Sequence, residues 1–292
     1  RMFDSYRRAK LQRAGLSCGR IRRKHQEGDW ADILRTHPAA FVVIILLFVA
    51  AVGTLMILGS KVTPGLPQPG LLIYSCAAAL ITALIIHLRV TMQGVINDNR
   101  DLALVLGTIS VHLALVVTML DYGFAKGWTG VLLVLAVPHA AAPLILSVLL
   151  GRKAGLFAAI YCTLLGVLIA VSVSPFTFLA SSTLIGFLSV AFTRHVRRRS
   201  HLFKAGLYLG VVASAFTLIL LTASNSEPTT PWLTLVGAPF LSAFFTGIIV
   251  SGLLPVLENI FGVTTEISWL ELSDLNHPLM RRLSIEAPGT YH

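Results

Sequence analysis

Eight stretches of about 20 mostly apolar residues constrain the fold of this chain more than any other feature of its sequence. A helix needs roughly 20 apolar residues to cross the hydrocarbon core of a bilayer. The stretches are 39–58, 70–88, 102–120, 128–150, 154–173, 175–193, 205–223 and 232–257. The sequence therefore predicts an all-α fold, a polytopic membrane helix bundle with eight spans.

The composition excludes a soluble protein. Of the 292 residues, 55% are hydrophobic and 12% are charged, whereas soluble domains carry about 25% charged residues. The mean hydropathy is +0.79. Cys18, Cys76 and Cys162 are scattered, and their spacing suits neither a zinc site nor a disulfide framework. We therefore expect them to be packing residues.

The fifth and sixth stretches are joined only by "SVSP" (172–175). A single helix of both stretches would be far longer than the bilayer is thick. Proline is well tolerated at the first position of a helix. We therefore predict a helical hairpin in which Pro175 begins the second helix.

The distribution of Lys and Arg predicts the orientation. With eight spans and the N-terminus inside, the segments 1–38, 89–101, 151–153, 194–204 and 258–292 hold 10, 2, 2, 5 and 2 of the 23 basic residues, and the outer side keeps Lys61 and Lys126. This is the positive-inside pattern. Both termini are therefore predicted to be cytoplasmic.

The same distribution explains the net charge of +10. Basic segments at the inner face of a membrane are attracted by anionic lipid. The expected partner is the lipid bilayer, and no nucleic acid is needed. Residues 1–38 form a basic cytoplasmic tail, either lying on the inner leaflet or solvated.

Few polar residues lie within the spans, and ionisable ones there are functional candidates. His112 lies in the middle of the third stretch, and His139 lies between Pro138 and Pro143 in the fourth. Prolines remove backbone donors, so we expect this helix to kink or loosen. These four residues are predicted to form a membrane pocket. Two neutral histidines bonded within a bundle, at an ordinary kink, are the alternative.

The segment after the last span is polar and rich in turns. Pro278, Leu279 and Leu283 fit a short amphipathic helix, which is too short to be stable without a partner. We predict that 258–292 is a cytoplasmic linker and that Pro255 sets the angle at which the chain leaves the membrane. The predicted linker and coupling residues are Pro255, Asp274, Asn276, Pro278, Arg281 and Arg282.

This same region carries a specific resemblance. "LLPVLENIFGVTTEISWLELSDLNHPLMRRLSIEAPGTYH" (253–292) closely resembles the junction between the last membrane helix and the HD domain in the bacterial seven-transmembrane HD-hydrolase family, the PgpH-type cyclic-di-AMP phosphodiesterases. The stretches 138–161 and 197–210 resemble that family's membrane region more loosely. The resemblance covers roughly residues 70 to 292.

The resemblance implies a domain order. Residues 1–38 are the tail, 39–58 the first transmembrane helix, 70–257 a seven-helix transmembrane domain and 258–292 the linker to an HD phosphohydrolase domain. By the family pattern the first metal ligand lies just beyond His292. We therefore expect no catalytic and no metal-binding residue in this chain.

The implied function is membrane anchoring and signal sensing for a phosphodiesterase in the bacterial inner (plasma) membrane. The intact protein would hydrolyse cyclic di-AMP with two divalent metal ions, Mn or Fe, in the HD domain. The signal would be an unknown small molecule or lipid, and the family also allows a homo-oligomer. The alternatives are a polytopic transporter or channel, and a membrane receptor without a catalytic domain.

Overall fold

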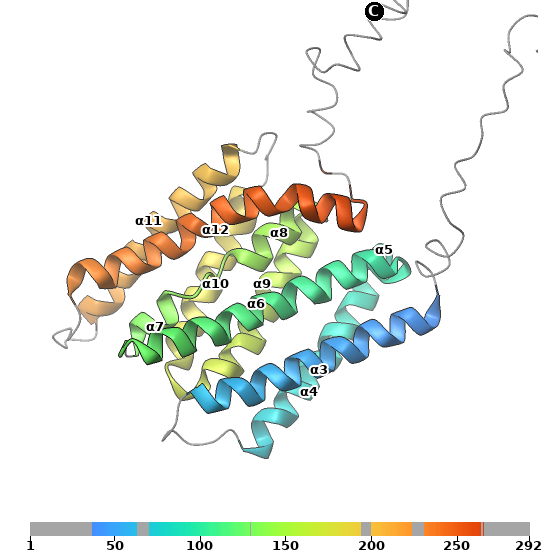
Figure 1. Cartoon of the computed structure of the whole chain (residues 1–292), viewed down its shortest axis with the longest axis horizontal. Coiled ribbons are helices and arrows are strands. Elements are labelled where there is room, and N and C mark those ends of the chain that lie inside the picture. The colour runs from blue at the N-terminus through green and yellow to red at the C-terminus, as the bar shows by residue number, and fades with distance from the viewer. Residues whose placement is uncertain are drawn as a thin grey trace, which may run out of the picture.

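The computed structural model describes residues 37–62, 70–128, 130–193, 200–223, 231–263 and 265. All regular structure in these residues is helical (Figure 1). The long helices are α3 (Pro38–Val62), α4 (Leu71–Thr91), α6 (Asn99–Ala125), α9 (Arg152–Ile169), α10 (Pro175–Phe192), α11 (Ser200–Ala223) and α12 (Trp232–Phe261). The short elements are α5 (Gln93–Asn97), α7 (Val131–Leu135), α8 (Ala141–Leu149) and the 3-10 turn η1 (Ala170–Ser172). Within the described part of the chain, seven helices are long and apolar enough to cross a membrane.

The predicted fourth span is not one continuous helix, and that part of the prediction is wrong. The stretch 128–150 forms two short helices, α7 and α8, separated by residues 136–140. Pro138 lies in this break and has no backbone N–H to continue the hydrogen-bond ladder of α7. The expected loosening at proline is thus a complete interruption of the helix.

The broken pair still runs along the bundle from one end to the other. At one end, a side chain added at Gly123 near the end of α6 would meet Leu133 of α7 and Trp128 just before it. At the other, Ser147 of α8 bonds to Thr193, which follows α10. The pair α7–α8 therefore extends over a length comparable with that of its long neighbours.

The start of α3, the start of α6 and the end of α12 lie at the same end of the bundle (Figure 1). The Asn99 side chain donates a hydrogen bond to the carbonyl of His37, 3.0 Å away. A Cβ built on Gly262, just after α12, would lie 3.3 Å from the Arg100 side chain. We call this end of the molecule end A and the opposite end, where α3 and α6 finish, end B.

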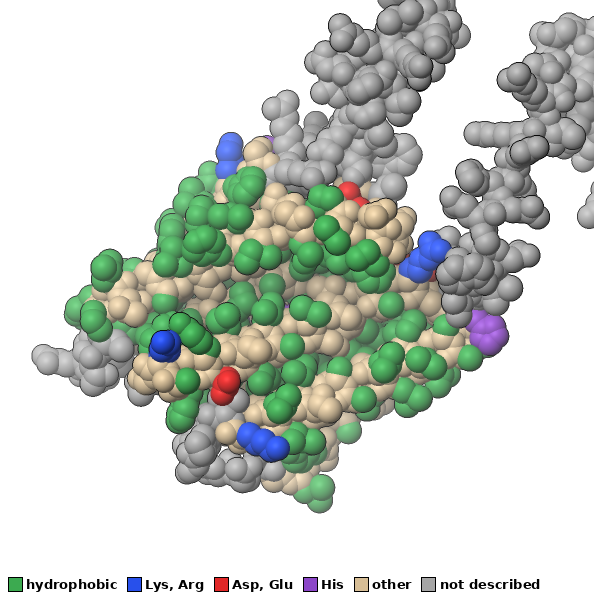
Figure 2. Space-filling model, viewed as in Figure 1, with side chains coloured by type: hydrophobic (Ala, Val, Ile, Leu, Met, Phe, Trp, Pro, Cys, Tyr) green, Lys and Arg blue, Asp and Glu red, His purple; other side chains and the backbone are tan. Residues whose placement is uncertain are grey.

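Charged side chains lie only near the two ends of the helices. In the described ranges, Lys61, Asp121 and Lys126 lie at end B, and every other Asp, Glu, Lys and Arg lies toward end A. On the face shown in Figure 2, these groups are separated by a band without charged side chains. Many large apolar side chains in that band are exposed, such as Leu47 (65%) and Ile249 (63%). Such a surface is suited to lipid rather than water.

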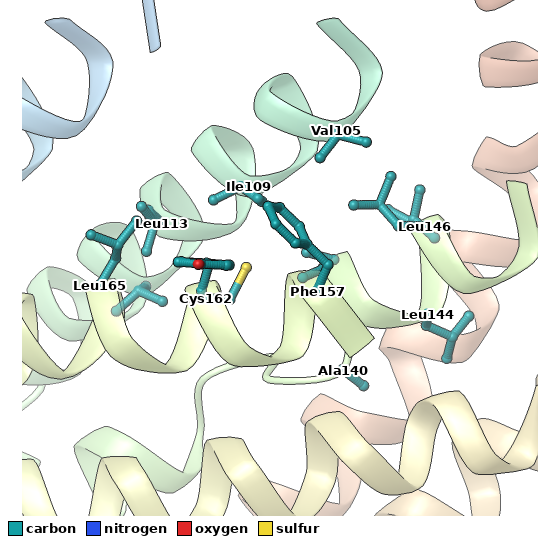
Figure 3. Close-up of a cluster of buried hydrophobic side chains, with 14 of the residues drawn as sticks. Val105, Ile109, Leu113, Ala140, Leu144, Leu146, Phe157, Cys162 and Leu165 are labelled. Carbon is teal, nitrogen blue, oxygen red and sulfur yellow. The ribbon is translucent and has the colours of Figure 1, made fainter. Parts of the chain in front are cut away.

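The core lies between α6, α8 and α9 (Figure 3). Val105, Ile109 and Leu113 recur every four residues on one face of α6, which is the spacing of one side of a helix. They face the α9 residues Phe157 and Leu165 (Figure 3). Another side of α6 packs against α3, and Thr108, His112 and Leu115 lie on a third side.

Helices α11 and α12 pack closely through glycine. A Cβ built on Gly247 would lie 2.8 Å from the carbonyl oxygen of Leu202 and 2.9 Å from the Cα of Gly206. Small residues allow such close backbone approach between membrane helices. The contact fixes α11 against α12, and Leu202 and Ala243 at this interface belong to the buried core.

The turn between α9 and α10 confirms the predicted hairpin. The helix α9 ends at Ile169, η1 follows, and Pro175 is the first residue of α10. At the other end of the chain, α12 passes through Pro239 and Pro255 without interruption and ends at Gly262, which adopts the left-handed conformation (φ 65°). Glycine adopts this conformation without strain and is common as a helix stop.

Candidate functional site

The break between α7 and α8 is closed by a histidine side chain. In a continuous helix the residue at 138 would donate to the carbonyl of Val134, but Pro138 has no N–H. The ring nitrogen Nε2 of His139 lies 3.0 Å from this carbonyl oxygen. Because a carbonyl only accepts, Nε2 of His139 carries a proton and donates it to this oxygen. It takes the place of the N–H that Pro138 lacks, beside the backbone N–H of Val137, which also donates to this carbonyl over 3.3 Å.

His139 is further held by α10. Its Nε2 lies 3.2 Å from Ser181 Oγ, and its ring packs edge-on against Phe178 with the centroids 5.0 Å apart. Ser181 also donates to the carbonyl of Phe178. The ring is 2% exposed. His139 is therefore a structural residue that secures the broken segment within the protein.

An apolar groove of about 520 Å³ lies in front of this break, between α6 and α12. From α6 it is lined by Ala103, Leu104, Gly107, Thr108, Val111, His112, Leu115 and Met119. Its floor is formed by Ala136, Pro138, Ala141, Ala142 and Ile145 of the α7–α8 segment. From α12 it is lined by Ser242, Phe245, Thr246, Ile249, Val250, Leu253, Leu257 and Phe261. We call this feature the α6–α12 groove.

The groove opens to the side of the molecule. Its rim residues Val111 and Ile249 are 61% and 63% exposed, and both lie on the apolar band between the charged ends. Figure 1 shows α6 and α12 on the viewer's side with α8 behind them. Figure 2 shows the same face, on which apolar side chains surround the opening. A ligand would reach the groove from the membrane.

His112 is the unusual residue in the wall of the groove. It is 1% exposed, and neither ring nitrogen has a hydrogen-bond partner among the described residues. A neutral imidazole has one N–H donor and one acceptor nitrogen. Buried polar groups are almost always bonded, so an unbonded ring here needs an explanation. His139 Nε2 bonds to the Val134 carbonyl and to Ser181, whereas neither ring nitrogen of His112 has such a partner among the described residues.

The structure separates the four residues predicted to form one pocket. His112 and Pro138 line the groove, while His139 turns toward α10. Pro143 contacts the other side, where its carbonyl oxygen would lie 3.0 Å from a Cβ built on Gly155. The two histidines therefore do not line one pocket together. They lie on different sides of the broken segment and have different bonding.

The groove continues to the last turn of α12. Leu257 and Phe261 line it, and the chain turns out of the helix at Gly262. Just beyond, Thr265 donates a hydrogen bond to Glu258 Oε1, which ties the first residues after the helix back to its last turns. Of the predicted coupling residues, Pro255 lies half-buried within α12. Asp274, Asn276, Pro278, Arg281 and Arg282 lie outside the described residues.

One polar contact was missed from the sequence. His87 Nδ1 of α4 lies 3.2 Å from the Tyr161 hydroxyl of α9, and the His87 ring also packs against Phe157. His87 falls within a predicted span, and ionisable residues in spans are candidates for bonding. The sequence therefore marked His87 as a candidate, but it could not identify Tyr161 as the partner, which lies 74 positions away in the chain.

The described residues offer no metal centre. Within the ranges that the structure describes, no group of three or more His, Cys, Asp or Glu residues is placed to hold a metal ion. The two divalent metals implied by the resemblance therefore do not fit any set of residues in these helices. No metal-dependent step is assigned to them.

Comparison with known proteins identifies this architecture. A family described as "7TM receptor with intracellular HD hydrolase" matches residues 67–265. The chain belongs to this family. The match runs from just before α4 to just beyond α12, so it contains the broken pair, the groove and the turn at Gly262.

Two curated relatives carry the same name. The chain is 33% identical over 156 residues to the "Cyclic-di-AMP phosphodiesterase PgpH" of Listeria monocytogenes, which covers 53% of the chain and 22% of that protein. It is 33% identical over 108 residues to the "Cyclic-di-AMP phosphodiesterase PgpH" of Bacillus subtilis, which covers 37% of the chain and 15% of that protein. The chain thus matches about a fifth of these relatives' length or less. No solved structure matches it.

The different bonding of the two histidines predicts opposite effects on stability. His139→Leu leaves the carbonyl of Val134 without its side-chain donor, which costs about 1–2 kcal/mol. We expect the melting temperature in nanodiscs to fall by several degrees. His112→Leu removes an unbonded polar ring from an apolar wall, so we expect no fall, or a rise.

The control is His139→Gln, whose amide N–H can replace the lost donor and should restore part of the stability. Equal destabilisation by His112→Leu and His139→Leu would show that His112 is a bonded structural residue. It would contradict this assignment.

Proposed function

We propose that this chain is the membrane region of a phosphodiesterase that, when intact, hydrolyses cyclic di-AMP through an HD domain. The proposal is supported by the family match and by the printed names of the two relatives. Two divalent metal ions, Mn or Fe, would belong to the HD domain, where they would activate water and bind the phosphate. The protein would lie in the bacterial inner membrane.

The chain crosses the membrane eight times in this proposal, with both termini in the cytoplasm. The region matched by the seven-transmembrane family contains six of the long helices. The α7–α8 pair supplies the seventh crossing of that region, and α3 adds an eighth. The pair is flanked by Lys126 at end B and Lys153 at end A. End A, with most of the positive charge, is the cytoplasmic end by the positive-inside rule.

The crossing by α7–α8 is tested by labelling cysteines in intact cells with a membrane-impermeant thiol reagent. The variants Lys126→Cys and Lys153→Cys place exposed thiols on either side of the segment. We expect the first to react from outside and the second only after the cells are permeabilised. Labelling of both from the same side would mean that α7–α8 does not cross.

The role of these helices is to bind a lipophilic signal and pass its effect to the cytoplasmic segment. The observation that carries this proposal is the composition of the groove wall. Eight of its lining residues belong to α12, and α12 is the helix that leads directly to residues 263–292. A ligand between α6 and α12 would favour one position of α12 over another, and it would shift the equilibrium by its difference in affinity for the two.

The helix α12 is held differently along its two sides. Toward α11 it is fixed by the backbone contact at Gly247. Toward α6 it borders the groove, whose lining is mostly apolar. Movement of the last turns of α12 therefore requires less rearrangement on the groove side. Pro255 removes one further backbone bond in this part of the helix.

The proposal is tested by filling the groove in the intact protein. Gly107 is exposed in the groove, and a Cβ built there meets nothing within 4 Å. The variant Gly107→Phe places a ring where a ligand would lie. We expect kcat for cyclic di-AMP hydrolysis to change by at least about fivefold, the lower range of allosteric coupling. KM should stay unchanged, since the substrate binds elsewhere.

The matched control is Gly53→Phe on α3, where a Cβ also meets nothing within 4 Å. It should leave kcat unchanged. If both variants hydrolyse cyclic di-AMP like the unchanged protein, the groove does not regulate the enzyme. If the intact protein does not hydrolyse cyclic di-AMP, the proposed activity is wrong.

A further inference from the structure

We propose that the α6–α12 groove binds an uncharged isoprenoid quinone, whose carbonyl oxygen accepts a hydrogen bond from His112 in the middle of the membrane. This inference rests on the proposed function of the groove and adds the chemical class of its ligand. It is built from the depth of His112, the character of the groove wall, and the shape and opening of the groove.

The depth of His112 restricts the polar group of the ligand. His112 is at the centre of α6 (Asn99–Ala125), so it lies about 20 Å from either end of this helix at 1.5 Å per residue. The charged residues Asp101 and Asp121 lie at nearly equal distances in the chain on either side. Phospholipid headgroups remain at the interfaces. The group that meets His112 must instead belong to a molecule that dissolves in the hydrocarbon core.

The groove wall requires that this group be uncharged. No Asp, Glu, Lys or Arg is among the residues that line the groove, and a charge at this depth without a partner is costly. The hydroxyls of Thr108 and Thr246 already donate to carbonyls of their own helices, those of Leu104 and Ser242. Ser242 of α12 adds a half-buried hydroxyl to the wall, but the ring of His112 is the fully buried polar group without a partner among the described residues, and it calls for an acceptor such as a carbonyl oxygen.

The shape of the groove fits a long, thin molecule. Along α6 its lining extends from Ala103 to Met119, which is about 24 Å at the helical rise. Its volume of about 520 Å³ lies within the usual range for small-molecule sites, about 300–1,000 Å³. The length exceeds one bilayer leaflet, about 15 Å of hydrocarbon. It can hold a ring at His112 and an apolar tail beside it.

These features favour a quinone over other lipids. A fatty acid would bring a carboxylate into a wall with no cation, and a hydrocarbon would leave His112 unbonded. A quinone is uncharged, carries carbonyl acceptors on a ring and has a tail that keeps it within the membrane. Val111 and Ile249 at the rim leave a lateral opening through which such a lipid can enter from the bilayer.

The test uses the full chain in nanodiscs with three probes whose alkyl tails have about nine or ten carbons: decylubiquinone, decanoic acid and decylbenzene. Infrared difference spectra report the carbonyl stretch of the quinone, which shifts to lower frequency on accepting a hydrogen bond. We expect a shifted band with the unchanged protein, its loss in His112→Leu and its recovery in His112→Gln, which keeps an N–H donor. His87→Leu, outside the groove, should keep the band.

Thermal stability provides the second readout. Decylubiquinone should raise the melting temperature of the unchanged chain, because a ligand that binds the folded state stabilises it. The rise should be smaller in His112→Leu and absent in Gly107→Phe. Decylbenzene should have a small effect that His112→Leu does not alter. The absence of a shifted carbonyl band, or a larger effect of decanoic acid, would overturn the quinone assignment.

These binding measurements do not depend on phosphodiesterase activity. If the quinone does not bind but Gly107→Phe still changes cyclic di-AMP hydrolysis, the groove is regulatory and the ligand class is wrong. If the quinone binds at His112 but hydrolysis never responds to Gly107→Phe, the ligand class holds and the regulatory role of the groove fails.

Discussion

The bond from His139 Nε2 to the carbonyl of Val134 is the interaction on which the centre of this bundle depends. Backbone groups at membrane depth must be bonded within the protein, and an interrupted helix is tolerated only where other helices surround it. Pro138 interrupts the α7–α8 segment, His139 gives the Val134 carbonyl a side-chain donor beside the backbone N–H of Val137, and α10 holds the ring in place through Ser181. The segment can therefore run the length of the bundle as two short helices, and the groove lies directly in front of the break.

The groove forms because different sides of α6 have different neighbours. One face, with Ile109 and Leu113, packs against α9 in the core (Figure 3). Another turns His112 toward α12, which is held on its far side by the glycine contact with α11. The same helix α12 forms one wall of the groove and ends where the chain leaves the bundle at Gly262. A membrane ligand and the cytoplasmic segment are therefore connected by one helix, which is the physical basis of the proposed signalling.

The sequence predicted those features that depend on local composition. Hydropathy located the long helices, Pro175 located the α9–α10 hairpin, and the prolines at 138 and 143 marked the place where a helix is disturbed. It did not predict what depends on distant contacts. The neighbours of His112 and His139 belong to other helices, and only the fold shows that α10 bonds one ring while α12 leaves the other unbonded. The pairing of His87 with Tyr161 was missed for the same reason.

The central claim, that a ligand in the groove moves the cytoplasmic end of α12, is tested most directly by a distance measurement. Spin labels at the exposed positions Val90 of α4 and Ile260 of α12 report this end of the helix by pulsed electron resonance, after Cys18, Cys76 and Cys162 are replaced by alanine. The account predicts that decylubiquinone shifts the distance distribution between the labels, and that the Gly107→Phe variant shows a distribution that no longer responds. An unchanged distribution in nanodiscs where infrared spectra show the quinone bound at His112 would contradict the claim.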